Sequence, residues 1–244
     1  MQNAFSRALS LLGREAARIV LPAWCVACGV ELPWRGRVAS CCAGCWSALP
    51  RIHGAKCTSC ALPLAGEAEV RCLACQSEPL PVEWCEASCH YRGSIERVLH
   101  AFKFKRHDFF DAPLAVLLEE TLRARGDLAF DAMVPVPMPR AKQRRRGYNQ
   151  AELLARELSK ITGIECDTSL LTKRRSRATQ STLARAVRRA NVRNTFESSS
   201  SVADRSILLV DDITTTGETL RACAAELTRH GAARVCAIAV AKAV

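Results

Sequence analysis

The feature that most constrains the fold of this chain is the stretch of residues 207–220, which reads ILLVDDITTTGETL. An apolar run ends in two carboxylates, Asp211 and Asp212, and is followed by threonines and one glycine. A helical pattern then starts at Glu218. Ligands of open α/β sheets bind outside the carboxyl ends of the strands. The stretch therefore predicts a buried strand, a ligand-binding loop and a helix, in that order.

The loop between the acid pair and the helix suits a phosphate group. The first N–H groups of a helix have no intrahelical partner and lie at the positive end of its dipole. Threonine hydroxyls add donors, and a glycine lets the backbone approach an anion closely. The loop residues expected to bind the ligand are Thr214, Thr215, Thr216, Gly217 and Thr219.

The acid pair suits a different group. Adjacent carboxylates repel each other unless they share donors or cations. A ribose offers two neighbouring hydroxyl donors, and Mg²⁺ bound nearby would offset the negative charge. Asp211 and Asp212 together with the loop therefore indicate a sugar phosphate that is held at both ends.

Strand and helix patterns alternate through the rest of the chain. Buried strands are expected at residues 132–137, 206–210 and 234–240, and helices at 114–122, 149–161 and 218–230. This order implies parallel pairing with right-handed crossovers, and hence an α/β fold in which helices flank a parallel sheet.

Cysteine spacing defines a second, smaller module. Eight of the fourteen cysteines form four Cys-x-x-Cys pairs: Cys25/Cys28, Cys42/Cys45, Cys57/Cys60 and Cys72/Cys75. Two intervening residues let both thiolates reach one tetrahedral Zn²⁺, so the pairs supply ligands for one or two structural ions. Sequential pairing is the simplest arrangement, and interleaved pairing stays open. Cys85, Cys89 and His90 are interpreted as ordinary buried residues in preference to a further partial site.

The excess positive charge lies in one part of the chain. Residues 140–193 hold fifteen Lys or Arg and four Asp or Glu, a net charge of +11, which equals the net charge of the whole chain. A local excess of this kind fits an anionic ligand, and a solvated basic face is the alternative.

The chain has no apolar stretch long enough to span a bilayer, so no membrane insertion is expected. Residues 1–21 have apolar groups on one side of an expected helix, but arginines interrupt every candidate signal-peptide core. A docking helix is preferred over a targeting segment, and a cytoplasmic location is expected.

Several motifs carry a resemblance to a known family. Residues 207–220 are similar to the phosphoribosyl pyrophosphate (PRPP) binding motif of type I phosphoribosyltransferases. Residues 134–140 (VPVPMPR), 145–154 (RRGYNQAELL), 179–180 and 185–191 resemble the ComF family. Its bacterial members join an N-terminal zinc module, here a double zinc ribbon, to a phosphoribosyltransferase domain. They are associated with DNA uptake in competence or with the use of external DNA.

The resemblance implies further site residues. In this fold the loop after the first strand binds pyrophosphate, which by position is Pro137, Met138, Pro139 and Arg140. A flexible basic hood over PRPP corresponds to residues 173–193. Six arginines are candidates for contact with pyrophosphate or nucleic acid, namely Arg144, Arg145, Arg146, Arg185, Arg188 and Arg189. For residues 144–146 a solvated turn is the alternative.

The expected organisation is an N-terminal helix at 1–21, a double zinc ribbon at 22–80 and a type I phosphoribosyltransferase domain at 81–244. The first functional hypothesis is a PRPP-binding protein of DNA uptake that works with single-stranded DNA and a DNA-translocation helicase. The alternatives are a phosphoribosyltransferase of nucleotide salvage with unknown acceptor, and a non-catalytic PRPP sensor that binds nucleic acid. Only Phe102, Phe104 and Tyr148 offer themselves for stacking on a base, and no general base is evident.

Overall fold

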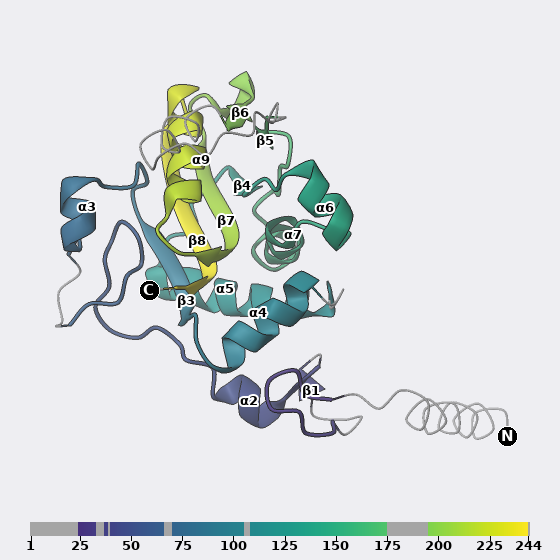
Figure 1. Ribbon diagram of the computed structural model, residues 1–244. Helices are drawn as coiled ribbons and strands as arrows, with labels where there is room; N and C mark the ends of the chain where they lie inside the picture. Colours follow the sequence, from purple (N-terminus) through teal and green to yellow (C-terminus); the bar gives the residue numbers. More distant parts are fainter. Residues whose placement is uncertain are drawn as a thin grey trace, which may run out of the picture.

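The computed structural model of the chain describes residues 24–32, 37–38, 40–65, 70–104, 108–174 and 195–243 (Figure 1). The helix expected at residues 1–21 lies outside these ranges, as do Arg185, Arg188 and Arg189 and most of the expected hood. No helix within the described ranges is both apolar enough and long enough to cross a membrane.

The central element is a parallel sheet of four strands in the order β3-β8-β7-β4. The strands are β3 (Cys85–His90), β4 (Ala132–Pro135), β7 (Ser206–Thr214) and β8 (Arg234–Lys242). The predicted parallel α/β architecture is confirmed. Strand β7 runs four residues past the predicted end at Val210, because β8 continues to pair with it as far as Thr214.

Strand β3 was not predicted as a strand. It pairs in parallel with β8 at one edge of the sheet. Its sequence, CEASCH, has no apolar alternation, although Cys85, Glu86, Ala87, Ser88 and Cys89 are all buried. A buried glutamate in this stretch obscures the strand pattern in the sequence. The carboxylate of Glu86 is paired with Lys56, whose Nζ lies 2.5 Å away, so a residue outside the strand compensates its charge.

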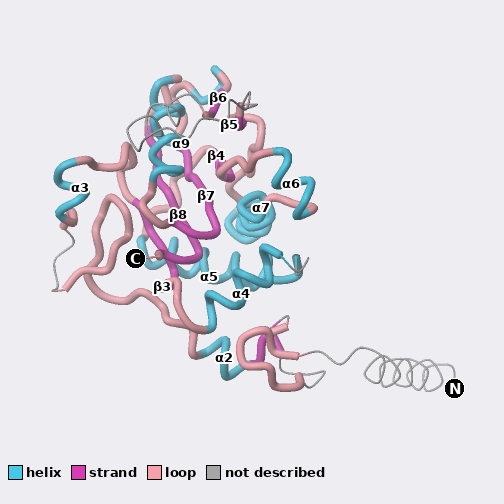
Figure 2. The backbone as a smooth tube through the Cα atoms, in the orientation of Figure 1, coloured by secondary structure: helices cyan, strands magenta, loops and turns pink. Residues whose placement is uncertain are grey.

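Helices cover both faces of the sheet (Figures 1 and 2). One core cluster packs α4 (Ser94–Phe104), α5 (Asp111–Arg125) and α7 (Gln150–Thr162) against one face, with the 3-10 turn η1 (Asp108–Phe110) before α5. A second cluster packs α9 (Glu218–Arg229) against the other face. Alternate residues of β7 divide between them, with Leu208 in the first cluster and Leu209 in the second, as the two-residue strand period requires.

Three shorter elements surround this sheet. Helix α6 (Arg140–Arg146) follows β4, where the sequence favoured a loop and turn. Strands β5 (Leu171–Lys173) and β6 (Phe196–Ser198) pair antiparallel, and the 3-10 turn η2 (Ser200–Val202) precedes β7.

The cysteine pairs lie in two small ribbons. The first contains β1 (Arg37–Val38), β2 (Cys41–Cys42) and α2 (Ala43–Ser47), and the second contains α3 (Leu73–Ser77). Buried residues of the first ribbon join the core cluster of α4 and α5, whereas those of the second join the cluster of α9. The two ribbons therefore belong to core clusters on opposite sides of the sheet. The division of the chain at residues 80 and 81 stays a prediction.

Candidate functional site

The candidate site lies at the carboxyl edge of the sheet, where β4 and β7 end side by side. Pro135 of β4 pairs with Val210 of β7, and the N–H of Val136 donates to the carbonyl of Val210 at 2.9 Å. The next residues of β4 lead into the loop at 137–140, and the next residues of β7 are the acid pair. Parallel pairing therefore brings the expected pyrophosphate loop beside Asp211 and Asp212.

The expected pyrophosphate loop is short and partly ordered by the start of a helix. Pro137 and Met138 are half-buried, whereas Pro139 and Arg140 are exposed. Pro139 caps α6, a position at which its fixed φ and missing N–H cost nothing. The side chain of Asn149 donates to the carbonyl of Val136 at 3.1 Å and so fixes the strand end before the loop.

The two aspartates have different environments. The backbone N–H of Asp212 donates to Oδ1 of Asp211 at 2.8 Å, which fixes the orientation of the Asp211 carboxyl group. Burial, followed by the negative charge of Asp212, raises the pKa of the Asp211 carboxyl to about 8. A cation bound beside the pair would favour the ionised form of Asp211 and oppose this shift.

Lys103 is a member of this site that sequence analysis did not identify. Its Nζ lies 3.0 Å from Oδ2 of Asp212, and both side chains are largely buried. Lys103 is in the last turn of α4, more than one hundred residues before the aspartates, and no motif surrounds it. Its ammonium occupies the position in which a cation would relieve repulsion between the two carboxylates.

The loop after the acid pair leaves several donors available. Helix α9 begins after Gly217, whose φ of 79° favours glycine, and among the described residues no side chain caps the helix. The hydroxyl Oγ1 of Thr214 is buried and has no hydrogen-bond partner within the described part of the chain. Thr215, Thr216 and Thr219 are exposed along the same loop and first turn. These groups together form a set of donors that suits an anion.

Gly217 also makes a close approach to another part of the chain. A Cβ on Gly217 would lie 3.1 Å from Cδ1 of Leu80, which follows the second ribbon. A larger residue at 217 would therefore disturb this packing as well as the loop. Sequence analysis assigned Gly217 a role toward the anion only, because no local pattern placed Leu80 nearby.

The three consecutive arginines of α6 differ from one another. These residues lie on a helix and not in a turn, and their contact with pyrophosphate or nucleic acid stays a prediction. Arg144 and Arg145 are exposed. Arg146 is half-buried, its guanidinium lies 4.7 Å from the ring centroid of Phe104, and its Nη1 donates to Gln150 at 3.1 Å. Helical periodicity turns Arg146 toward Phe104 and Gln150 and leaves the other two side chains exposed.

The three aromatic candidates for stacking on a base differ in their exposure. Phe102 is fully buried and cannot present its ring to a base. The hydroxyl of Tyr148 donates to the carbonyl of Phe102 at 2.6 Å, so it is used within the core. Phe104 is 53% exposed and is the aromatic of the three that can face a ligand.

The eight paired cysteines form two clusters in sequential order. Cys25, Cys28, Cys42 and Cys45 make the first cluster, and Cys57, Cys60, Cys72 and Cys75 make the second, with all sulfurs of a cluster within 4.8 Å of one another. The Sγ atoms of Cys60 and Cys72 are 3.8 Å apart, and those of Cys28 and Cys42 are 3.9 Å apart. Four thiolates around a tetrahedral Zn²⁺ would lie about 3.8 Å apart, so each donor set fits a structural zinc ion.

The two clusters repeat one local structure. The N–H of Cys42 donates to Sγ of Cys25, and the N–H of Cys72 donates to Sγ of Cys57, at 3.4 and 3.3 Å. Burial raises the pKa of the Cys57 thiol, but the N–H of Cys72 and its neighbours outweigh burial and lower the pKa to about 7. The same opposing causes lower the pKa of Cys25 to about 6. Each cluster therefore has one sulfur that is prepared to bind a metal as thiolate.

The other cysteines among the described residues belong to neither cluster. Cys41, Cys85, Cys89, Cys223 and Cys236 are buried in the core, and Cys166 is half-buried. Burial raises the pKa of the Cys89 thiol to about 11, which keeps it protonated and apolar. Cys85 and Cys89 are buried, as interpreted from the sequence, whereas His90 is half-buried.

Comparisons with known proteins place this site in a family. The sequence profile of the phosphoribosyl transferase domain matches residues 144–243. The DNA utilization protein YhgH of Salmonella typhi is 34% identical over 183 residues, which are 73% of this chain and 80% of that protein. The competence protein F of Haemophilus influenzae is 34% identical over 138 residues, which are 54% and 60% of the two chains. The chain belongs to the ComF family.

The ComF assignment agrees with the architecture described above. The parallel sheet flanked by helices is a type I phosphoribosyltransferase fold, and the two four-cysteine clusters stand at its N-terminal side. The solved structure of the glutamine PRPP amidotransferase from B. subtilis, complexed with ADP and GMP, covers 53% of this chain and 26% of its own at 21% identity. The TM-score of this match is 0.38.

Proposed function

We propose that this chain binds PRPP together with Mg²⁺ at the carboxyl edge of the sheet. The observation that carries the proposal is the junction of β7 and α9, where an acid pair and an uncapped helix start are separated by a short loop. The loop from Thr214 to Thr219 would hold the 5-phosphate, and Asp211 and Asp212 would accept the ribose hydroxyls. Residues 137–140 lie beside the acid pair and would face the pyrophosphate.

Magnesium fits the same carboxylates. Mg²⁺ prefers carboxylate oxygens together with phosphate oxygens of the substrate. Lys103 supplies the positive charge at Asp212 when no ligand is bound. A magnesium complex of PRPP would bring a divalent cation to this position, so Lys103 becomes available to contact a phosphate oxygen. The chemistry of the family also supports the proposal, since the matched domain is named for phosphoribosyl transfer.

The first prediction concerns ligand affinity. Asp212→Ala should lower the affinity for PRPP about ten- to a hundredfold, because a charge-assisted hydrogen bond contributes roughly 1.5–3 kcal/mol. Calorimetry with PRPP, ribose 5-phosphate and pyrophosphate, with and without Mg²⁺, would separate the subsites. Asp131→Ala is the matched control, since this exposed carboxylate accepts the N–H of Ser206 at the opposite end of β7. Failure of both PRPP and ribose 5-phosphate to bind the folded, metal-loaded wild type would overturn the proposal.

We also propose that the chain serves the use of external DNA, as the names of its relatives indicate for those proteins. Single-stranded DNA is the proposed ligand of the basic region, and a DNA-translocation helicase is the proposed partner. Arg144 and Arg145 support this, because both side chains are exposed on α6 near the carboxyl edge of the sheet. Arg146 is excluded from this role by its contacts with Phe104 and Gln150.

The second prediction tests this surface through salt dependence. Single-stranded DNA should bind weakly and without strong sequence preference, and its affinity should fall steeply with salt because counterions are released. The double variant Arg144→Ala/Arg145→Ala should reduce the slope of log affinity against log salt by about 1.4, since each phosphate contact contributes about 0.7. The control, Arg123→Ala/Arg229→Ala, removes the same charge from exposed ion-paired positions and should keep the slope. Equal slopes for the two double variants would contradict the assignment.

A phosphoribosyltransferase of nucleotide salvage is the competing function. It would need a base platform, and the burial of Phe102 leaves Phe104 for that role among the three aromatic candidates. Incubation of labelled PRPP with a panel of nucleobases and amines, followed by detection of released pyrophosphate, distinguishes a transferase from a PRPP sensor without catalysis.

A further inference from the structure

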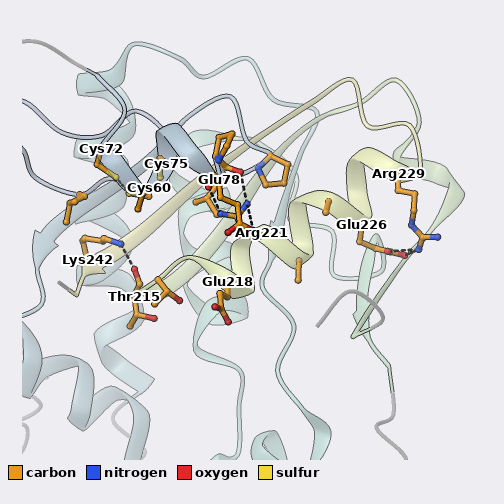
Figure 3. A pocket seen from close by; sticks show the side chains of 18 residues that line it. Cys60, Cys72, Cys75, Glu78, Thr215, Glu218, Arg221, Glu226, Arg229 and Lys242 are labelled. Carbon is orange, nitrogen blue, oxygen red and sulfur yellow. Dashed lines mark hydrogen bonds and ion pairs between the residues drawn. The ribbon is translucent and has the colours of Figure 1, made fainter. Parts of the chain in front are cut away.

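A cavity of about 870 Å³ separates the second cysteine cluster from the phosphate loop and α9 (Figure 3). Cys60, Cys72 and Cys75 line one side of it, and Thr215, Thr216 and Arg221 line the other. Its three cationic side chains already donate to groups of the chain. Arg221 and Lys242 donate to backbone carbonyls, and Arg229 donates to Glu226. The cavity therefore lies at the boundary between the second ribbon and the part of the domain that contains the phosphate loop. Three contacts connect these two parts.

The first contact across this boundary is made by Lys242, the last residue of β8. It is 4% exposed, and its ammonium donates to the carbonyl oxygen of Thr215 in the phosphate loop. Figure 3 shows this contact beside the sulfurs of Cys60 and Cys72. Lys242 lines the same cavity as Cys60, Cys72 and Cys75, so its side chain lies between the cluster and the loop.

The second link runs from the metal ligands to Gly217. Ser59 lies between Cys57 and Cys60, is 2% exposed, and accepts the N–H of Leu80 at 3.0 Å. The side chain of Leu80 then packs against Gly217, the residue from which α9 starts. A change in the shape of the cluster would thus reach the phosphate loop through one hydrogen bond and one packing contact.

The third link fixes the first turn of α9. The guanidinium of Arg221 donates to the carbonyls of Glu78 and Pro79, at 2.7 and 2.6 Å (Figure 3). These two carbonyls belong to the segment that follows α3 of the second ribbon. The fork geometry of an arginine makes such a paired contact directional, so it holds the helix start in one orientation.

We propose that the second cysteine cluster, when it holds zinc, positions the phosphate loop, and that Lys242 is the positioning residue between them. Four thiolates and one Zn²⁺ leave a net charge of −2 near Lys242. The buried ammonium is then held between this negative charge and the carbonyl of Thr215. Loss of the metal or of the ammonium would release the loop and weaken binding of a phosphate monoester. This inference rests on the proposed function, in which that loop binds the 5-phosphate.

The first cluster provides an internal control. It joins the core on the opposite face of the sheet, and among the described residues the hydrogen bonds of its cysteines stay within the first ribbon and do not reach residues 214–219. Lys56 is a matched control for Lys242, because it is also a largely buried lysine of the second ribbon region and pairs with Glu86, away from the loop. A general loss of stability would affect the controls as much as the test variants.

The test uses the full chain in four variants: Lys242→Met, Lys56→Met, Cys72→Ser in the second cluster and Cys42→Ser in the first. Calorimetry would measure affinity for ribose 5-phosphate, elemental analysis would count zinc, and hydrogen exchange would report protection of residues 214–220 without ligand. Lys242→Met should keep its zinc but lose affinity about tenfold and exchange faster in the loop. Cys72→Ser should lose one ion and show the same two effects.

The controls define the outcomes. Cys42→Ser should also lose one ion and Lys56→Met none, and both should keep the affinity and the loop protection of the wild type. Wild-type affinity and protection in Lys242→Met would overturn the inference. A wild type that does not bind ribose 5-phosphate would instead count against the proposed function. The positioning of the loop by Lys242 and the cluster is still tested in that case, because hydrogen exchange measures loop protection without any ligand.

Discussion

Cys57→Ser is expected to lower the zinc content from two ions per chain to one and to unfold the second ribbon. Cys57 is fully buried among three other sulfurs, and its lowered thiol pKa of about 7 prepares it to bind the metal as thiolate. Free energies of structural zinc binding in small peptides are about 10–16 kcal/mol at neutral pH, and in such modules they are coupled to folding. A serine oxygen replaces a strong ligand with a weak one, so much of this energy is lost.

Elemental analysis of protein purified without chelator, together with thermal unfolding, measures this effect. Cys89→Ser is the control, because Cys89 is equally buried but belongs to neither cluster. The control should keep two ions, although it loses some stability through burial of a hydroxyl. Wild-type protein that is fully folded without any metal would show that the cysteine clusters do not hold structural zinc.

Asp211→Asn is expected to stabilise the ligand-free protein, and the gain should grow with pH. The folded-state pKa of Asp211 is about 8 and its ordinary value is 3.8, so the folded state binds the extra proton between these values. The unfolded state binds fewer protons in this interval, and the free energy of unfolding therefore falls as pH rises toward 8. Asparagine avoids the charge and removes this loss. The two pKa values differ by about four units and each unit corresponds to about 1.4 kcal/mol, so the gain near pH 8 should be several kcal/mol.

Thermal unfolding of the zinc-loaded, ligand-free protein between pH 6 and 9 tests whether the stability gain grows with pH. The difference in melting temperature should increase up to about pH 8, the pKa of Asp211, and change little above it. Asp212→Asn should act in the opposite direction, because it leaves the largely buried Lys103 without its carboxylate. Lys103, Cys223 and Cys85 also interact with Asp211, and none of them is changed. A melting temperature for Asp211→Asn at or below that of the wild type throughout would contradict the prediction.

The same protonation has a functional consequence. A magnesium complex of PRPP requires the ionised acid pair, so binding at pH 7 should release a proton from Asp211. Stability of the empty site and affinity for the ligand are therefore opposed at this residue, as is common where charges are assembled for binding.

Local patterns in the sequence were sufficient for the phosphate loop and the paired cysteines. The order of apolar run, acid pair, threonines and helix depends on neighbours in the chain, and β7, its loop and α9 are formed by contiguous residues. Two-residue spacing likewise brings two thiolates together without help from the rest of the fold. The helices expected at 149–161 and 218–230 agree with α7 and α9 to within one residue at each end.

Contacts between distant segments had to come from the tertiary structure. Strand β3 pairs with β8, more than 140 residues further along the chain, and the charge of its Glu86 is offset by Lys56. Lys103 reaches Asp212 from α4, Leu80 reaches Gly217 from the second ribbon, and neither carries a local motif. Arg146 differs from Arg144 and Arg145 only because α6 turns it toward Phe104.

The sequence by itself thus determined which residues are the candidates for binding a phosphate, a ribose and zinc, because the motifs that indicate them are short stretches of chain. The tertiary structure decided which charges face the acid pair, which arginines stay exposed, and that the second cysteine cluster adjoins the phosphate loop through Leu80, Arg221 and Lys242. The physical reason is that burial and charge compensation depend on groups far apart in the chain, and only packing brings these together.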